Sequence, residues 1–567
     1  MLLNGAQILI EVLAEQKADI VFGYPGGAVL NIYDELYKNS HRIKHIISAH
    51  EQGAAHAADG YARASGKTGV VIATSGPGAT NLVTGIANAY LDSVPMVAIT
   101  GNVAAGLIGK DSFQEVDIVG ITQPIVKHNF IVRDVNTLEK TLKEAFFIAE
   151  TGRKGPVLVD IPKSVQIAMC EYEGGKVEVK SYSTKYFNDM DKAREAILNC
   201  QKPYIYCGGG VVAAEAEQDI MELSKRLSAP IGLSMMGLSA IPRSYEMNLG
   251  MCGMHGKYAA SVAQAEADLI IAAGVRFSDR ATGNVKEYAS KCTIIHIDID
   301  AAEIGKNVKS RIGLCGDVSQ ILRELLSDLP EKKNEDWVKK VMEIKEFSRQ
   351  EVLNQNPPER FSPKNIINLV NTYCDADTVI ATDVGQHQMW TAQFFKFESP
   401  RTFLTSGGLG AMGYGLGAAI GGCIAVGGRK MAVLFTSDGS FGMNLTEMAT
   451  AVSQELPLLV VILNNGTLGM VRQWQSMFYD ERYSQTTLSR KTDFKKLAEA
   501  FGAIGYSAFD LEGLSKALED YSKRLNITGE NKNEGFVPAI IDCHIDIDEK
   551  VLPMIPPGGS VKDIVTK

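Results

Sequence analysis

Short apolar segments alternate along the chain with segments whose apolar residues recur at helical spacing. Runs such as VVIAT at 70–74, MAVLFT at 431–436 and LLVVIL at 458–463 have the length and β-branched character of buried strands. Between such runs lie helical patterns, among them glycine- and alanine-rich ones at 53–65 and 410–420. Alternation of this kind is typical of α/β folds with mostly parallel sheets. We therefore predict an α/β protein.

Two polar stretches divide the chain into three parts. Residues 171–188 and 328–363 are rich in charged and polar residues and lack strand-like runs, as linkers between domains do. A chain of 567 residues is also too long for a single hydrophobic core. We predict three domains, over residues 1–170, 189–328 and 362–567.

The first and third parts are predicted to be versions of one structural unit. In each, a strand ends at a threonine, a helix follows, and a proline begins the next strand. The same number of residues separates Thr74 from Pro95 as separates Thr436 from Pro457. A glycine- and alanine-rich helix precedes both units. We expect two related domains that flank a Rossmann-like central domain.

Composition and charge exclude several classes of protein. Hydrophobic residues make up 45% of the chain and charged residues 22%, which is typical of a soluble globular protein. The net charge of -9 argues against a nucleic-acid partner. No run reaches the roughly 18 apolar residues of a membrane span, and the first residues lack a signal- or transit-peptide pattern. The nine cysteines show no CxxC spacing, which indicates reduced thiols in the cytoplasm.

An acidic turn and a pair of asparagines follow two neighbouring strands of the third part. The strand that ends at Thr436 leads into Ser437-Asp438-Gly439-Ser440, and the next strand ends at Asn464-Asn465. Parallel strands of a βαβ unit end at the same edge of the sheet. A carboxylate and an amide oxygen there suit Mg²⁺, and the small residues let backbone N–H groups approach a diphosphate. The alternative is a plain strand–turn–helix with an aspartate cap.

Glu51 is the candidate catalytic acid of the first part. It follows the apolar run HIIS at 45–48 and precedes a helix of glycine and alanine, so we expect it to be largely buried. Burial raises the pKa of a carboxyl group and favours proton donation near neutral pH. The alternative is a glutamate that merely stabilises the N-terminus of a helix.

Taken together, these motifs identify a resemblance that extends over essentially the whole chain. The acidic turn with Asn464-Asn465 is similar to the diphosphate-binding motif of thiamine-diphosphate enzymes, with Ser437 in the place of its first glycine. Among these enzymes the chain resembles the catalytic subunits of the acetolactate synthase family. The runs that carry this resemblance are 24–28, 50–66, 75–81, 111–117, 127–129, 155–163, 384–390, 405–410, 468–474 and 552–559.

The resemblance implies thiamine diphosphate and Mg²⁺ as cofactors, and 2-keto acids as substrates. Glu51, Gln114 and Lys163 would be catalytic, with Glu51 activating the cofactor. Asp438, Asn465 and the backbone carbonyl of Thr467 would bind Mg²⁺. Other contacts to thiamine diphosphate would come from Gly27, Val384, Gly385, Gln386, His387, Gly410, Met412, Gly439, Ser440 and Met470. The substrates would also face Phe113, Val471 and Trp474.

The central part carries a glycine turn after a strand, at 208–210, which alone is a weak nucleotide-binding signal. Arginines and carboxylates at later strand ends suit diphosphate and ribose groups. The resemblance implies FAD without a redox role in turnover, although Ser278 replaces the first aspartate of the family's Asp-Asp-Arg. A domain without flavin is the alternative. The implied FAD residues are Arg153, Gly208, Gly209, Gly210, Met254, His255, Gly274, Arg276, Arg280, Asp298 and Asp317.

The implied reaction decarboxylates pyruvate and joins the two-carbon unit to a second pyruvate or to 2-ketobutyrate. The products would be 2-acetolactate or 2-aceto-2-hydroxybutyrate, which lead to the branched-chain amino acids. Alternatives are another thiamine-diphosphate 2-keto-acid decarboxylase or oxidase, and a non-catalytic paralogue. The resemblance also implies a homodimer or tetramer with active sites at the dimer interface, and a small regulatory subunit.

Overall fold

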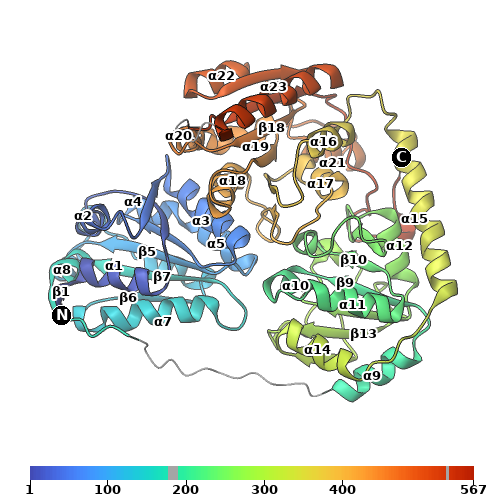
Figure 1. The fold of residues 1–567 in the computed structure, drawn as a ribbon, viewed down its shortest axis with the longest axis horizontal. Helices are drawn as coiled ribbons and strands as arrows, with labels where there is room; N and C mark the ends of the chain where they lie inside the picture. Colours follow the sequence, from blue (N-terminus) through green and yellow to red (C-terminus); the bar gives the residue numbers. More distant parts are fainter. Residues whose placement is uncertain (176–188, 531–534, 567) are drawn as a thin grey trace.

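The computed structural model describes residues 1–175, 189–530 and 535–566. Three six-stranded sheets, all of them parallel, form its framework, each with helices packed against it (Figure 1). Both faces of each sheet are buried. Val71 points into one hydrophobic cluster, for example, while its neighbours Val70 and Ile72 point into another. The predicted α/β fold with mostly parallel sheets is confirmed.

The first and third sheets have the same topology. Their strand orders are β3-β2-β4-β5-β7-β6 and β16-β15-β17-β18-β20-β19, which are identical when each set is counted from its own first strand. The prediction of two related domains is therefore confirmed. The strands are β2 (Ile20–Tyr24), β3 (Lys44–Ile47), β4 (Gly69–Ala73), β5 (Met96–Asn102), β6 (His128–Ile131), β7 (Pro156–Pro162), β15 (Val379–Thr382), β16 (Phe403–Leu404), β17 (Ala432–Thr436), β18 (Leu458–Asn464), β19 (Ile504–Ala508) and β20 (Ala539–His544).

The central sheet has the order β11-β10-β9-β12-β13-β14. Its chain order reverses between the first strand, β9, and β12, as in Rossmann-like sheets, so this prediction is also confirmed. A separate two-stranded antiparallel sheet joins β1 (Leu2–Asn4) to β8 (Met169–Glu171). The central strands are β9 (Pro203–Cys207), β10 (Ile231–Leu233), β11 (Asn248–Met251), β12 (Leu269–Ala273), β13 (Thr293–Asp298) and β14 (Ile312–Cys315).

Helices connect the strands and cover the sheets. Those around the first sheet are α1 (Gly5–Glu15), α2 (Leu30–Lys38), α3 (Glu51–Ser65), α4 (Pro77–Asn81), α5 (Val83–Leu91), α6 (Ile118–Thr122), α7 (Leu138–Glu150) and α8 (Lys163–Ile167). Those around the central sheet are α9 (Met190–Asn199), α10 (Gly209–Ala213), α11 (Glu217–Leu227), α12 (Tyr258–Glu266), α13 (Asp279–Thr282) and α14 (Val318–Ser327).

The remaining helices follow the central sheet. They are α15 (Glu335–Gln355), α16 (Pro363–Asn371), α17 (Gln386–Phe394), α18 (Tyr414–Ala425), α19 (Asp438–Asn444), α20 (Met448–Ser453), α21 (Gly469–Phe478), α22 (Phe494–Phe501) and α23 (Leu511–Glu530). Short 3₁₀ helices are η1 (Ala105–Leu107), η2 (Gln123–Ile125), η3 (Val135–Thr137), η4 (Met235–Gly237), η5 (Leu445–Glu447) and η6 (Val561–Asp563).

The second predicted linker contains α15, a helix of 21 residues at one edge of the molecule (Figure 1). Its buried residues are Trp337 and Val341. The Trp337 indole N–H donates to the carbonyl of Pro203 at 3.0 Å, which ties the helix to the central domain. The first predicted linker lies largely outside the described residues. The domain limits themselves stay predictions.

The third domain packs against both of the other domains. Helices α3 of the first domain and α18 of the third meet through glycine and alanine. A methyl group added at Gly421 would lie 1.9 Å from the carbonyl oxygen of Ala57, and one at Gly60 would lie 2.2 Å from that of Ala418. The opposite face of the third sheet shares a hydrophobic cluster with the central domain. Glycines at the two contact points are thus required by close backbone approach.

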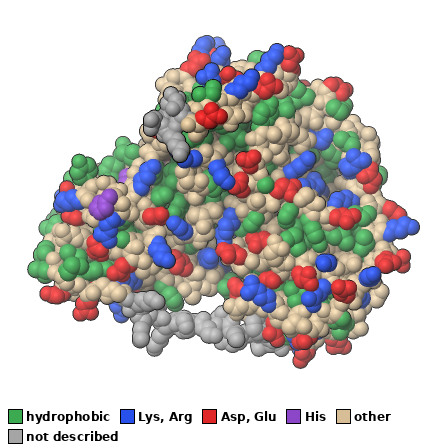
Figure 2. All heavy atoms as spheres, viewed as in Figure 1, with side chains coloured by type: hydrophobic (Ala, Val, Ile, Leu, Met, Phe, Trp, Pro, Cys, Tyr) green, Lys and Arg blue, Asp and Glu red, His purple; other side chains and the backbone are tan. Residues whose placement is uncertain are grey.

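Acidic and basic side chains are interspersed over the face of the molecule shown in Figure 2. Within the described residues, no helix combines the length and the apolar character that a membrane crossing requires.

We expect Gly421→Ala to lower the midpoint of thermal unfolding, because overpacking a close contact costs about 1–3 kcal/mol. Gly529→Ala is the matched control, since no atom lies within 4 Å of a methyl group added there. Circular dichroism melts of the two variants and the parent measure the effect. Identical melts for both variants would contradict the requirement for glycine.

Candidate active site

The candidate diphosphate site lies where β15 and β17 end, at the carboxyl edge of the third sheet. The chain order reverses between these two adjacent strands, so their connections leave in opposite directions and open a crevice between them. The strand β15 leads into Val384 and Gly385, and β17 leads into Asp438. Gly385 has a φ of 152°, a backbone conformation that favours glycine.

Asp438 is the first residue of α19 and its side chain is buried. Its Oδ1 atom is buried and has no hydrogen-bond partner among the described residues. Burial raises the pKa of the Asp438 carboxyl group to about 6. An unpaired buried carboxylate oxygen is costly, and a cation bound there would remove that cost.

Asn465 and Thr467 follow β18, which pairs in parallel with β17, so they lie at the same edge of the sheet as Asp438. The Asn465 amide donates from Nδ2 to Oε1 of Gln386 at 3.1 Å, which leaves its own oxygen available. Thr467 is adjacent to Leu468, whose Cδ2 would lie 2.9 Å from a methyl group at Gly439. The set of one carboxylate, one amide and one carbonyl fits Mg²⁺. No cluster of three or more His, Cys, Asp or Glu side chains suited to a metal occurs in the described part of the chain.

The start of α17 completes this edge with Gln386 and His387. Gln386 donates from Nε2 to Oε1 of Gln473 at 3.0 Å and to the carbonyl of Glu549 at 2.7 Å. His387 is buried, and its Nε2 atom has no partner among the described residues. Burial lowers the pKa of His387 to about 3, so the imidazole is neutral near pH 7.

The candidate aminopyrimidine residues Gly410 and Met412 adjoin the same edge. A methyl group at Gly410 would contact Cγ1 of Val384 at 3.9 Å, and the Ser440 hydroxyl donates to the Val384 carbonyl at 2.9 Å. Met412 is half-buried and precedes Gly413, whose N–H donates to Oδ1 of Asp383 at 2.6 Å. The structure therefore brings the predicted residues of the third domain together.

The other candidate half-site lies at the carboxyl edge of the first sheet. Glu51 is the first residue of α3 and is half-buried, less than the sequence predicted. Its Oε2 accepts from Nδ2 of Asn81 at 3.0 Å. Gln114 has a φ of 58°, and its Cα would lie 2.9 Å from a methyl group at Gly76. The turn at 75–78 thus lies next to both Glu51 and Gln114, which are far apart in sequence.

Gly27, Phe113 and Lys163 belong to the same half-site. Gly27 follows β2 and has open space around it, and Lys163 begins α8 directly after β7. Phe113 is 87% exposed. Because β2, β3 and β7 are parallel, Gly27, Glu51 and Lys163 share one edge of the sheet.

Three predicted substrate or cofactor residues lie on α21. Met470 packs against a hydrophobic cluster, while Val471 is 50% exposed. Trp474 has a buried indole nitrogen without a partner among the described residues. The guanidinium of Arg280, from the central domain, lies 5.7 Å from the centre of the Trp474 ring. The alternative to a site role, that Met470 and Trp474 are ordinary core residues of a helix face, agrees with the packing of Met470, and the roles of both residues stay predictions.

The predicted FAD residues gather at the carboxyl edge of the central sheet. The turns after β9 and β12 touch: a methyl group at Gly208 would lie 2.0 Å from the Gly274 carbonyl oxygen, and one at Gly210 would lie 2.6 Å from Gly274 Cα. Gly209 is nearest to Met236. Burial raises the pKa of Asp298, at the end of β13, to about 6.

Other predicted FAD residues already have protein partners. Arg153 donates to Oε1 of Glu303 at 2.9 Å, Asp317 caps α14, and the Arg276 carbonyl accepts from Asn307 at 2.9 Å. The Arg280 guanidinium lies 3.5 Å from the sulfur of Met254, and burial lowers the pKa of His255 to about 4. The strand-end placement fits a dinucleotide, and FAD itself stays a prediction.

Comparison with known proteins agrees with this geometry. Family models of thiamine pyrophosphate enzymes match the N-terminal TPP binding domain at residues 3–121, the central domain at 190–325 and the C-terminal TPP binding domain at 383–529. The chain is 42% identical to the acetolactate synthase isozyme 2 large subunit of Escherichia coli, over the whole of both chains. It is 43% identical to the probable acetolactate synthase large subunit of Methanocaldococcus jannaschii, over 99% of this chain and 95% of that one.

The chain belongs to the acetolactate synthase large-subunit family. The resemblance found in its motifs is confirmed, and so is the expectation of a thiamine-diphosphate enzyme. The roles of single residues stay predictions.

Glu447 was not identified from the sequence as a candidate site residue. It is buried, and it accepts from the backbone N–H groups of Ala49 at 3.2 Å and His50 at 3.0 Å. Thr450 donates to its Oε2 at 2.7 Å. Burial raises the pKa of Glu447, and these hydrogen bonds oppose the rise. The third domain thus holds the turn that positions Glu51. Asp383 was also missed, although its place at the end of β15 was a usable signal.

We expect Glu447→Ala to lower kcat by about 100-fold, because a small misplacement of a reacting group has effects of this size. Glu447→Gln keeps one acceptor oxygen and should recover part of the loss. Steady-state kinetics with pyruvate, at a temperature where each variant is folded, separate kcat from KM. Exposed Glu455, changed to Gln, is the control. A lowered melting temperature with unchanged kcat would show that Glu447 has a structural role only.

Proposed function

We propose that this chain is the catalytic subunit of an acetolactate synthase. It decarboxylates pyruvate and joins the two-carbon unit to a second pyruvate or to 2-ketobutyrate, giving 2-acetolactate or 2-aceto-2-hydroxybutyrate. One observation carries the proposal. Two sheets of identical topology present Glu51 at one carboxyl edge and the Asp438–Asn465 pair at the other, in a chain of this family.

Thiamine diphosphate, when bound, supplies the electron sink for decarboxylation. Asp438, Asn465 and the Thr467 carbonyl hold Mg²⁺, and the orphaned Oδ1 of Asp438 supports this role. Neutral His387 adds no positive charge to the diphosphate side. Asn81 occupies Oε2 of Glu51, which leaves Oε1 to hold the proton exchanged with the aminopyrimidine ring.

Side chains from both half-sites bind the substrates. The Lys163 ammonium attracts the carboxylate of a 2-keto acid, and the Gln114 amide can donate a hydrogen bond to a carboxylate or carbonyl oxygen. Phe113 and Val471 supply apolar contact. Trp474 restricts the size of the second 2-keto acid.

We further propose a homodimer or tetramer with active sites at the dimer interface. Each half-site leaves apolar side chains exposed. Tyr24 and Phe113 are 39% and 87% exposed beside the first, and Met443 and Val471 are 58% and 50% exposed beside the second. A second copy that brings its diphosphate edge to the Glu51 edge would bury both sets. The small 2-keto acids would then bind between subunits.

Three further assignments accompany this function. A small regulatory subunit is supported by the name "large subunit" of the relatives. FAD, without a redox role, is assigned to the carboxyl edge of the central sheet. A cytoplasmic location is supported by the nine cysteines, all of which are free.

Purified protein should form acetolactate from pyruvate only when thiamine diphosphate and Mg²⁺ are both present. Glu51→Gln should lower the rate about 100-fold or more, the usual loss when a general acid–base is removed, while Glu512→Gln on the exposed face of α23 should not. Omission of FAD tests the central domain. Acetaldehyde or acetate without acetolactate would instead indicate a decarboxylase or oxidase, and no turnover a non-catalytic paralogue.

Asp438→Asn should raise the Mg²⁺ concentration needed for half-maximal activity at least tenfold, because a neutral amide binds a hard cation weakly. Asp480→Asn removes a solvent-exposed carboxylate and serves as the control. Activity titrations with Mg²⁺ give the comparison, and melting curves with Mg²⁺ and thiamine diphosphate give a readout that does not need turnover. Equal Mg²⁺ requirements in the two variants would remove Asp438 from the metal site.

A further inference from the structure

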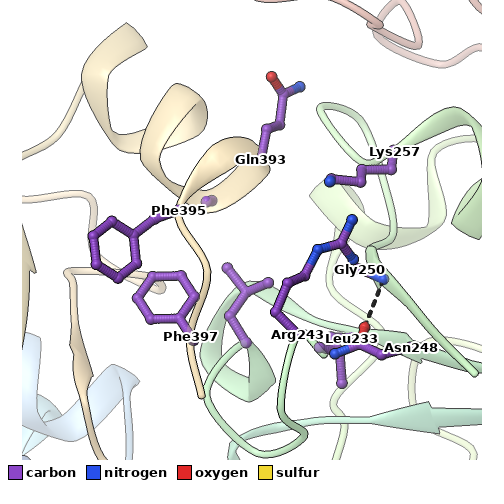
Figure 3. A pocket seen from close by; sticks show the side chains of 10 residues that line it. Leu233, Arg243, Asn248, Gly250, Lys257, Gln393, Phe395 and Phe397 are labelled. Carbon is purple, nitrogen blue, oxygen red and sulfur yellow. Dashed lines mark hydrogen bonds between the residues drawn. The ribbon is translucent and has the colours of Figure 1, made fainter. Parts of the chain in front are cut away.

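A small cavity lies between the central and third domains, at the opposite end of α17 from Gln386 and His387 (Figure 3). The central domain contributes Arg243 and Lys257, from the loops on either side of β11, together with Gly250 of that strand. The third domain contributes the end of α17, with Gln393 and Phe395. Two basic side chains therefore face a space that is otherwise lined largely by uncharged residues.

Arg243 and Lys257 meet at Gly250. A methyl group added there would lie 3.2 Å from Nη1 of Arg243 and 3.0 Å from Cδ of Lys257. Figure 3 shows the guanidinium and the ammonium directed into the same space. Nη1 of Arg243 is buried without a hydrogen-bond partner among the described residues. No acidic side chain of the described chain forms an ion pair with either group, so two adjacent positive charges lack compensation.

The surroundings make the positive charge of Lys257 unfavourable unless an anion is bound. Lys345 is a third basic neighbour. Burial lowers the pKa of Lys257 well below its ordinary value, and the charges of Arg243 and Lys345 lower it further. Glu398 is the acidic residue that acts on Arg243, but it accepts hydrogen bonds from the backbone N–H and the hydroxyl of Ser244 instead.

The polar groups nearby cannot balance the charge. The Asn248 side chain is fully engaged: its amide donates to the carbonyls of Ile241 and Pro242, and its oxygen accepts from Gly250 N–H at 2.8 Å. Gln393 donates to the His255 carbonyl at 2.9 Å, and its unpartnered Oε1 carries no net charge. Arg243 and Lys257 are half-buried, and cations that are partly removed from water are stabilised when an anion accompanies them.

We propose that this cavity, whose free space of about 10 Å³ admits a group little larger than a water molecule, binds one chloride ion between the Arg243 guanidinium and the Lys257 ammonium. The guanidinium N–H groups can donate to such an ion, and the ammonium adds a point charge. Both basic ligands belong to the central domain, and the end of α17 from the third domain closes the cavity. The anion acts on stability and takes no part in the reaction.

The test measures the thermal unfolding midpoint of the holoenzyme, saturated with thiamine diphosphate, Mg²⁺ and FAD. Potassium chloride or sulfate replaces potassium gluconate at constant ionic strength. We expect a saturable rise of the midpoint with chloride in the parent protein, and no saturable rise with sulfate, which is too large for the cavity. Sulfate also stabilises proteins non-specifically, without saturation, and the variants below correct for this effect.

The double variant Arg243→Met/Lys257→Met should lose the saturable rise. In gluconate its midpoint should equal or exceed that of the parent, because an uncompensated charge pair has been replaced by apolar side chains. The single variants Arg243→Gln and Lys257→Gln provide the same comparison if the double variant does not fold. An equal anion dependence in parent and variants, or none in the parent, would overturn the proposal. A parallel melt without FAD completes the test: a rise that occurs only without FAD would also overturn the proposal, because the cavity would then belong to the flavin site.

Discussion

The placement of every candidate functional residue depends on one constraint, the parallel direction of all strands within each six-stranded sheet. Parallel strands end at a common edge, and strands adjacent in space but not in the chain open a crevice there. Glu51, Gly27 and Lys163 therefore share one edge, Asp438 and Asn465 a second, and Gly208 and Asp298 a third. Side chains that are remote in sequence are brought to one edge by the direction of the strands, and no specific contact between those side chains is needed.

This regularity explains how much could be predicted from the sequence. The strand runs, the threonine and proline landmarks and the Asp438–Asn465 spacing are local patterns, and each of them predicted the correct element and edge. The repeated topology followed from the same landmarks. Charge-rich α15 was read as a linker because its buried side chains, Trp337 and Val341, are too few to produce a clear helical periodicity.

Contacts between domains were beyond the sequence. Glu447 and the N–H of Ala49 are 398 positions apart, and no local pattern reveals which backbone groups a buried carboxylate will meet. The same holds for Arg280 above Trp474 and for the pair Arg243 and Lys257. Glu51 was expected to be more buried than it is, because the apolar run before it indicates a strand and not what covers the strand's end.

The glycine-faced contact between α3 and α18 also limits how this protein can evolve. At Gly60 and Gly421 the neighbouring atoms are backbone carbonyls, which no substitution on the facing helix can remove. A larger residue could be accepted only if the helices themselves moved apart, and that movement would carry Glu447 away from the turn before Glu51. The two related domains can therefore change sequence at their sheet edges independently, but the residues of the α3–α18 contact can change only together with the distance between the two helices.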